Sequence, residues 1–150
     1  MTLRPLVFLF LLLGALCAPA ARAEEPAIGY VKTVMGDATV TNGKIHVTAQ
    51  PGTPVFLGSQ LKTGAQSSMG VTFKDDTVMS FGANTELTVD AYLYAPAQSQ
   101  FKLAATLLRG SLNYVSGLIA KLQPDAVSVK TPTGIIGVRG TQFVVKVDGS

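Results

Sequence analysis

Arg139 has the most distinctive chemical setting in this chain, within residues 131–147, which read TPTGIIGVRGTQFVVKV. Counting by twos places Arg139 on the same strand face as the apolar side chains of Phe143, Val145 and Val147. A guanidinium stays protonated, and a buried one needs carboxylates or several carbonyl oxygens around it. The pattern therefore predicts that Arg139 is an inward-facing structural clamp. A contact with a ligand or partner is the alternative.

The residues around Arg139 have unusual backbone properties. Pro132 fixes its own φ, while Gly134, Gly137 and Gly140 permit a positive φ or the close approach of another backbone segment. A phosphate-binding loop with this glycine spacing would continue into Lys-Ser/Thr and a helix, and this sequence does neither, so strand bulging is the preferred interpretation. The candidate structural site therefore comprises Pro132, Gly134, Gly137, Arg139, Gly140 and Thr141.

The other reactive side chains form no catalytic or metal-binding pattern. The chain has one histidine, His46, and one cysteine, Cys17, which cannot build a zinc cluster. There is no Gly-x-Ser-x-Gly motif, no calcium-loop spacing and no clear pair of facing carboxylates. Asp75 and Asp76 fit a tight turn, whose geometry aspartate tolerates. We therefore expect no catalytic, cofactor-binding or metal-binding residues, and a protein that is not an enzyme.

Residues 1–23 are typical of a secretory signal peptide. Arg4 precedes an apolar run over residues 6–16, and residues 21–23 read Ala-Arg-Ala, a small-x-small cleavage site. The apolar run is too short for a membrane-spanning helix, which needs roughly 20 apolar residues. We therefore expect a periplasmic or secreted protein that begins at Glu24 after cleavage and has no membrane insertion.

Removal of this leader leaves a nearly neutral chain. The full sequence has 12 Lys and Arg and 9 Asp and Glu residues, and two of the basic ones, Arg4 and Arg22, belong to the leader. A neutral chain lacks the basic patch that nucleic acid or an anionic membrane surface requires. Cys17 also leaves with the leader, so residues 24–150 must be stabilised by a hydrophobic core, and their length suits one domain.

From residue 24 onward, short alternating runs are separated by turn residues. Asn42-Gly43 predicts a hairpin between two such runs. Asp75-Asp76 predicts a second tight turn, which as a two-residue loop would place Phe73 opposite Val78. The segment from Leu118 to Leu122 fits one helical turn or a continuing strand. With turns about every 8 to 12 residues, the sequence predicts an all-β fold of short antiparallel strands, as a sandwich, barrel or β-roll.

Several of these segments resemble, in order, the FecR domain family. The matching segments are residues 29–36, 58–68, 71–77, 84–89, 108–112 and 131–143, the last of which contains the family's Gly-Val-Arg-Gly-Thr motif. FecR-like features thus span residues 28–147, although Asp76 stands where the family usually has glycine. The resemblance implies a β-rich periplasmic module of the kind found in regulators of iron-siderophore uptake.

The resemblance covers the module and not the whole signalling circuit. A FecR-type regulator typically has a cytoplasmic segment for a sigma factor and a membrane-spanning helix, and a cleavable leader replaces both here. We therefore expect a non-enzymatic exported module that binds a protein partner in envelope sensing or signalling. The alternative is a periplasmic protein that binds cell wall or carbohydrate.

The end of the chain carries one more expectation. Residues 144–147 predict a strand and Asp148-Gly149 a hairpin turn, yet only Ser150 follows. Members of the FecR family usually continue with a returning strand, so the resemblance implies that the FecR-like domain of residues 24–150 lacks its final strand, or that the gene product is truncated. An unpaired strand edge would permit strand addition by a partner or self-association.

Overall fold

The computed structural model describes residue 19 and residues 25–148. The predicted signal peptide, residues 1–23, lies outside this range except for Pro19. Within the described range, no helix has the length and apolar character needed to span a membrane.

The predicted all-β fold is confirmed. The strands in chain order are β1 (Gly29–Met35), β2 (Ala38–Asn42), β3 (Ile45–Thr48), β4 (Pro54–Val55), β5 (Gln60–Thr63), β6 (Ser68–Phe73), β7 (Val78–Phe81), β8 (Glu86–Ala95), β9 (Gln100–Val115), β10 (Val127–Thr131), β11 (Gly134–Gly137) and β12 (Gln142–Val147). The helical segments are η1 (Pro96–Gln98), α1 (Leu118–Leu122) and η2 (Pro124–Ala126).

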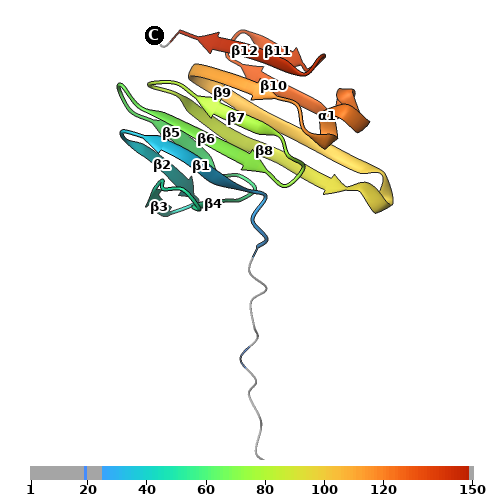
Figure 1. The fold of residues 1–150 in the computed structure, drawn as a ribbon, viewed down its shortest axis with the longest axis horizontal. Helices are drawn as coiled ribbons and strands as arrows, with labels where there is room; N and C mark the ends of the chain where they lie inside the picture. The colour runs from blue at the N-terminus through green and yellow to red at the C-terminus, as the bar shows by residue number, and fades with distance from the viewer. Residues whose placement is uncertain (1–18, 20–24, 149–150) are drawn as a thin grey trace, which may run out of the picture.

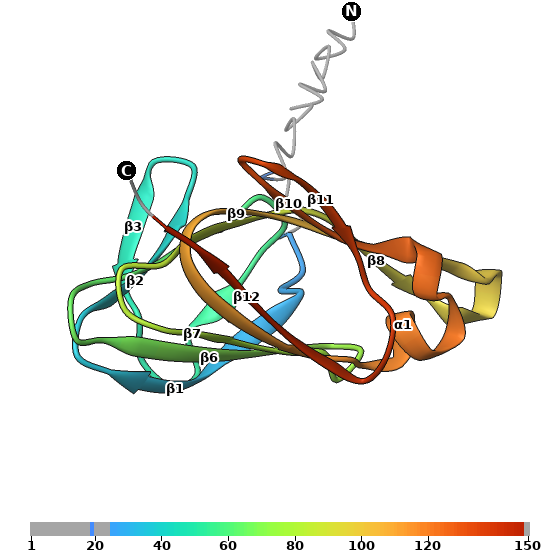
Figure 2. The same cartoon turned by 90° about the horizontal axis from the view of Figure 1, so that it is seen from above.

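These strands form one twelve-stranded sheet that curls into two facing layers (Figures 1 and 2). Along its main path the strand order is β3-β2-β5-β8-β9-β7-β6-β1-β4, and β10, β11 and β12 branch off beside β9. Every second side chain of each strand points toward the opposite layer. Strands with alternating apolar and polar residues can therefore enclose an apolar core between the layers.

Strand β9 is the element that both layers share. Its first part pairs with β8 on one edge and β10 on the other, and its last part pairs with β7 and β12. The chain bends between these parts at Gly110, where φ is +93°. Thr85 fills the space beside this bend, and its hydroxyl accepts a hydrogen bond from the Ser111 N–H at 3.1 Å.

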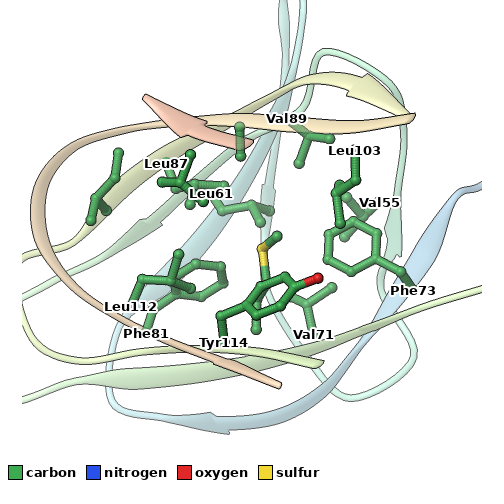
Figure 3. Close-up of a cluster of buried hydrophobic side chains, with 14 of the residues drawn as sticks. Val55, Leu61, Val71, Phe73, Phe81, Leu87, Val89, Leu103, Leu112 and Tyr114 are labelled. Atoms are coloured by element: carbon green, nitrogen blue, oxygen red, sulfur yellow. The ribbon is translucent and has the colours of Figure 1, made fainter. Parts of the chain in front are cut away.

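The core lies between the two layers, and Figure 3 shows side chains from both pointing into it. Leu87 and Leu103 come from one layer and Phe73 and Phe81 from the other. All four are at most 2 % exposed. Burial of apolar area of this kind contributes roughly 25 cal/mol per Å2, so this interior is the main stabilising feature.

The turn residues determine the strand pairing in two of the hairpins. Asn42-Gly43 forms the predicted hairpin, with Asn42 paired to Ile45. The hairpin of β6 and β7 differs from the two-residue prediction: Thr72, not Phe73, pairs with Val78. The loop is one residue longer because Asp76 adopts a positive φ of +67°, so the expected pairing was wrong.

The segment Leu118–Leu122, for which the sequence left two interpretations open, is a five-residue α-helix. It connects the end of β9 to β10, and β10 then runs parallel to β9. This crossover gives the one parallel strand pair among the described residues, in a sheet that is otherwise antiparallel as predicted.

The bend at Gly110 generates a stability prediction. A Cβ at this position would collide with Thr85, and the positive φ of +93° adds backbone strain. We expect Gly110→Ala to lower the free energy of unfolding by more than about 2 kcal/mol, measured by urea denaturation. The matched control is Gly52→Ala, where φ is +96° but a Cβ would meet no atom within 4 Å. Equal losses for both substitutions would contradict close packing at the bend.

Candidate functional site

The residues that the sequence singled out form a hairpin, a connector and a strand. Pro132 and Thr133 make the turn between β10 and β11, and both are exposed. Residues 138–141 then join β11 to β12 and run beside α1 (Figure 2). We call residues 138–141 the connector.

Arg139 is exposed at the middle of the connector, and no described carboxylate lies within ion-pair distance of its guanidinium. The prediction of an inward-facing clamp is therefore wrong. Phe143, Val145 and Val147 do share the inner, partly buried face of β12. The alternation fails before β12 because Gly140 has a φ of +96°, which is not a strand conformation, so Arg139 does not continue the phase of the strand.

The backbone of the connector is fixed on both sides of Arg139. Val138 is only 4 % exposed and packs in the core. On the other side, the Ser116 N–H donates to the carbonyl oxygen of Thr141 at 2.8 Å, and the Ser116 hydroxyl donates to that of Gly140 at 2.9 Å. The connector therefore holds its main chain against the fold while the Arg139 side chain extends into solvent.

The three glycines of the motif do not behave alike. Gly140 has the positive φ that the sequence predicted, whereas Gly134 and Gly137 do not. An added Cβ at any of the three would meet no atom within 4 Å. The expectation of a positive φ or a close approach therefore holds at Gly140 and is wrong at Gly134 and Gly137, which lie on β11, an exposed edge strand that pairs with β10.

Two adjoining hollows lie beside Arg139. The larger has a volume of about 440 Å3 and the smaller about 290 Å3, and Pro124, Asp125 and Arg139 line both. Val127 and Val138 contribute apolar surface to the larger hollow. This arrangement offers a cation next to a partly apolar depression, which is a setting for recognition by charge and shape rather than for bond chemistry.

A buried carboxylate holds the segment that carries Ser116. Asp75 has no exposed surface. Its Oδ2 accepts hydrogen bonds from the Thr77 hydroxyl at 2.7 Å and the Ile119 N–H at 3.1 Å, and its Oδ1 accepts one from the Tyr92 hydroxyl at 2.9 Å. Its main-chain oxygen accepts from the Leu118 N–H at 2.7 Å. Asp75 therefore fixes the start of α1 next to the connector.

The sequence placed Asp75 in a turn but missed this role. The available signal was the spacing Asp75-x-Thr77, which is typical of an aspartate that bonds to the backbone two residues later. Nothing local in the sequence indicates the partners Tyr92 and Ile119, since they come from segments that only the fold brings together.

Two tyrosines near this carboxylate are hard to ionise. Burial, together with the negative charge of Asp75, raises the pKa of Tyr92 far above its ordinary value near 10. Burial also raises the pKa of Tyr114. The Tyr114 hydroxyl has no hydrogen-bond partner among the described residues, and its ring stacks on Phe143 with centroids 4.8 Å apart.

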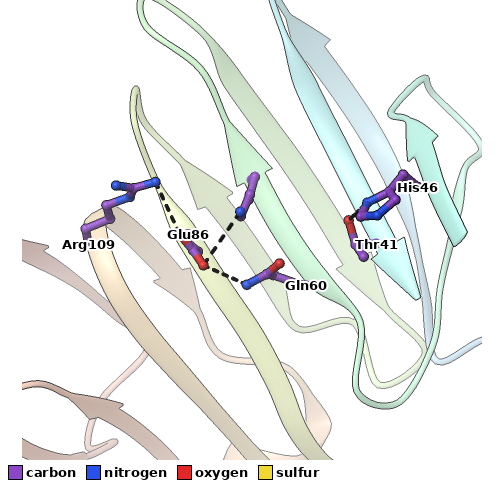
Figure 4. A network of polar contacts seen from close by, with 6 residues as sticks. Thr41, His46, Gln60, Glu86 and Arg109 are labelled. Carbon is purple, nitrogen blue, oxygen red and sulfur yellow. Dashed lines mark hydrogen bonds and ion pairs between the residues drawn. The ribbon is translucent and has the colours of Figure 1, made fainter. Parts of the chain in front are cut away.

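A second polar cluster lies near the bend of β9 and is satisfied within the chain (Figure 4). Glu86 is at its centre: Oε1 accepts from the Gln60 amide at 2.6 Å, and Oε2 pairs with Arg109 at 3.2 Å. Lys62 lies 3.8 Å from Oε1. A groove of about 570 Å3 opens beside Glu86 and Arg109. Because both cations already share Glu86, we interpret this cluster as a structural cross-link between strands.

The remaining candidates give no reactive arrangement. His46 is exposed on β3, with Nδ1 at 2.9 Å from the Thr41 hydroxyl, as expected of a solvated strand residue (Figure 4). Among residues 25–148, no three His, Cys, Asp or Glu side chains are grouped so that they could hold a metal ion.

The exposure of Arg139 leads to a stability prediction. Because its side chain contacts no described carboxylate, we expect Arg139→Ala to change the free energy of unfolding by less than about 0.5 kcal/mol. Val138→Ala, one residue earlier, removes buried methyl groups and should cost about 1–3 kcal/mol. Chemical denaturation of both variants distinguishes the two roles. A loss of several kcal/mol for Arg139→Ala would restore the buried clamp.

The raised tyrosine pKa values predict a loss of stability at high pH. The unfolded chain ionises Tyr92 and Tyr114 near pH 10, whereas the folded chain keeps them protonated. The stabilisation that comes from their protonated hydroxyls is therefore complete below about pH 10. Above this pH, the free energy of unfolding falls by up to about 1.4 kcal/mol per pH unit for each tyrosine. Urea denaturation across this range measures the slope. Tyr92→Phe should reduce it, and an unchanged slope in this variant would exclude Tyr92 as a source.

The comparisons with known proteins agree with the motif. Residues 59–150 match the family model described as FecR protein, which takes in β5 to β12, the connector and α1. No curated protein and no solved structure gave a match. The matched region covers more than half of the 150 residues. With the last four residues of its Gly-Val-Arg-Gly-Thr motif in a connector anchored to Ser116, and its strands curled around a shared core, the chain belongs to the FecR family of regulatory domains.

Proposed function

We propose that this protein is an exported, non-enzymatic binding module that acts through a protein partner in sensing or signalling at the bacterial envelope. Membership of a regulatory family supports the class of function. The signal-peptide pattern of residues 1–23 supports export to the periplasm or beyond. The observation that carries the proposal is the exposed Arg139 on a connector whose backbone is fixed.

A fixed backbone with a free charged side chain favours binding. Ordering a flexible loop at an interface reduces affinity, and a preorganised segment avoids much of that cost. Arginine is also enriched among the residues that contribute most to protein–protein affinity. Val138 and Ser116 provide the preorganisation here, and Arg139 provides the contact group.

Self-association through a strand edge stays a prediction. Within the described chain, β12 pairs with β9 on one edge and with no strand on the other. Val144 on β12 is 69 % exposed, so the outer face of this edge strand has apolar surface. Such an edge accepts an added strand readily, although the exposed Lys146 opposes uncontrolled pairing.

Affinity capture tests the proposed function. The full chain is immobilised and exposed to solubilised envelope extract, with an excess of free chain as competitor to establish specificity. We expect recovery of a membrane or periplasmic protein that is lost with competitor and that binds saturably once purified. Specific recovery of peptidoglycan or another polysaccharide, without a protein, would instead support the cell-wall interpretation and contradict the proposal.

A further inference from the structure

We propose that Arg139 and the exposed face of α1 form one docking surface for an acidic segment of a partner protein. This proposal rests on the proposed function and specifies the partner's chemistry. We call the surface formed by Arg139, Lys121, Leu118, Leu122 and Pro124 the α1 surface.

The two parts of the α1 surface are joined through the chain at both ends of α1. Leu118 follows two residues after Ser116, whose N–H and hydroxyl hold the connector. Pro124, two residues after Leu122, lines both hollows beside Arg139. The views in Figures 1 and 2 agree in placing α1 at the end of the molecule where β11 leads into β12.

Two of the exposed side chains of α1 are apolar leucines. Leu118 is 37 % and Leu122 is 58 % exposed. They are four residues apart and therefore lie on the same side of the helix. Ala120 lies on the opposite side and is 6 % exposed, and Ile119, next to it, is fully buried. The helix is thus anchored by one side and presents leucines from another.

The charge of the α1 surface favours a carboxylate. Arg139 and Lys121 are both exposed, and neither forms an ion pair with any described residue. Asp125 is the one acidic side chain that lines the hollows, and it too lies beyond ion-pair distance of Arg139. A guanidinium binds a carboxylate through two parallel hydrogen bonds, so an aspartate or glutamate of a partner complements Arg139.

The composition favours a peptide segment over a lipid surface. Recognition of anionic membranes uses clusters of about 4–8 basic residues. The α1 surface has Arg139 and Lys121, and an acidic residue, Asp125, lies among them. Leucines beside a single arginine match instead a segment in which apolar side chains flank one or two carboxylates.

An array of ten-residue peptides tests this proposal. Aspartate and leucine positions are varied, and each acidic peptide has a counterpart with asparagine in place of aspartate. Binding of the full chain is measured by fluorescence polarisation. We expect acidic members to bind at least about tenfold more tightly than their counterparts, since a charge-assisted pair is lost.

Variants locate the binding site. Arg139→Ala should weaken binding about tenfold or more, Arg139→Lys should restore part of it, and Leu122→Ala should weaken it separately. Lys44→Ala is the matched control, because Lys44 is exposed in the turn between β2 and β3, away from α1. Thermal melting of every variant confirms that the fold is retained.

Three outcomes would overturn the α1 surface. In the first, no peptide of the array shows binding that requires both its carboxylate and Arg139. In the second, Arg139→Ala binds the peptides as tightly as the unmodified chain. In the third, the chain binds only to phosphatidylglycerol vesicles. The last would favour an anionic surface. Affinity capture with Arg139→Ala separates the two proposals: undiminished recovery of the partner would refute the α1 surface and leave the proposed function standing.

Discussion

The pairing of β9 on both of its edges is the constraint on which the rest of the structure depends. A strand of 16 residues cannot serve two facing layers unless it bends, and Gly110 permits that bend without steric conflict with Thr85. Each part of β9 then receives one strand from each side. The core closes because the bend directs alternate side chains of both parts, such as Leu103 and Leu112, into the same interior.

The position of the connector follows from that arrangement. The end of β9 leads directly into Ser116 and α1, and Asp75 secures the start of α1 by accepting hydrogen bonds from Leu118 and Ile119. This buried carboxylate has no ion-pair partner among residues 25–148, and it is tolerated because several hydrogen-bond donors surround it. The exposed Arg139 is thus held in place by a series of buried and partly buried hydrogen bonds.

Regular features were predictable where the determining interactions are local. The hairpin at Asn42-Gly43 and the inner face of β12 follow from turn chemistry and from alternation, and both were found. The same alternation was misleading at Arg139, because a single positive φ at Gly140 removes the strand geometry on which the count depends. The alternation of residues does not reveal where a strand begins. In this chain β12 begins at Gln142, so Arg139 lies before the strand and is exposed.

The sequence by itself determined an all-β chain with a FecR motif, since periodicity, turn residues and motif spacing are properties of short segments. Only the tertiary structure decided that Arg139 faces solvent and that Asp75 is buried beneath α1. The physical reason is the same in both cases. Burial depends on which distant segments cover a residue, and Tyr92 and Ser116 meet their partners because β9 bends and pairs on both edges.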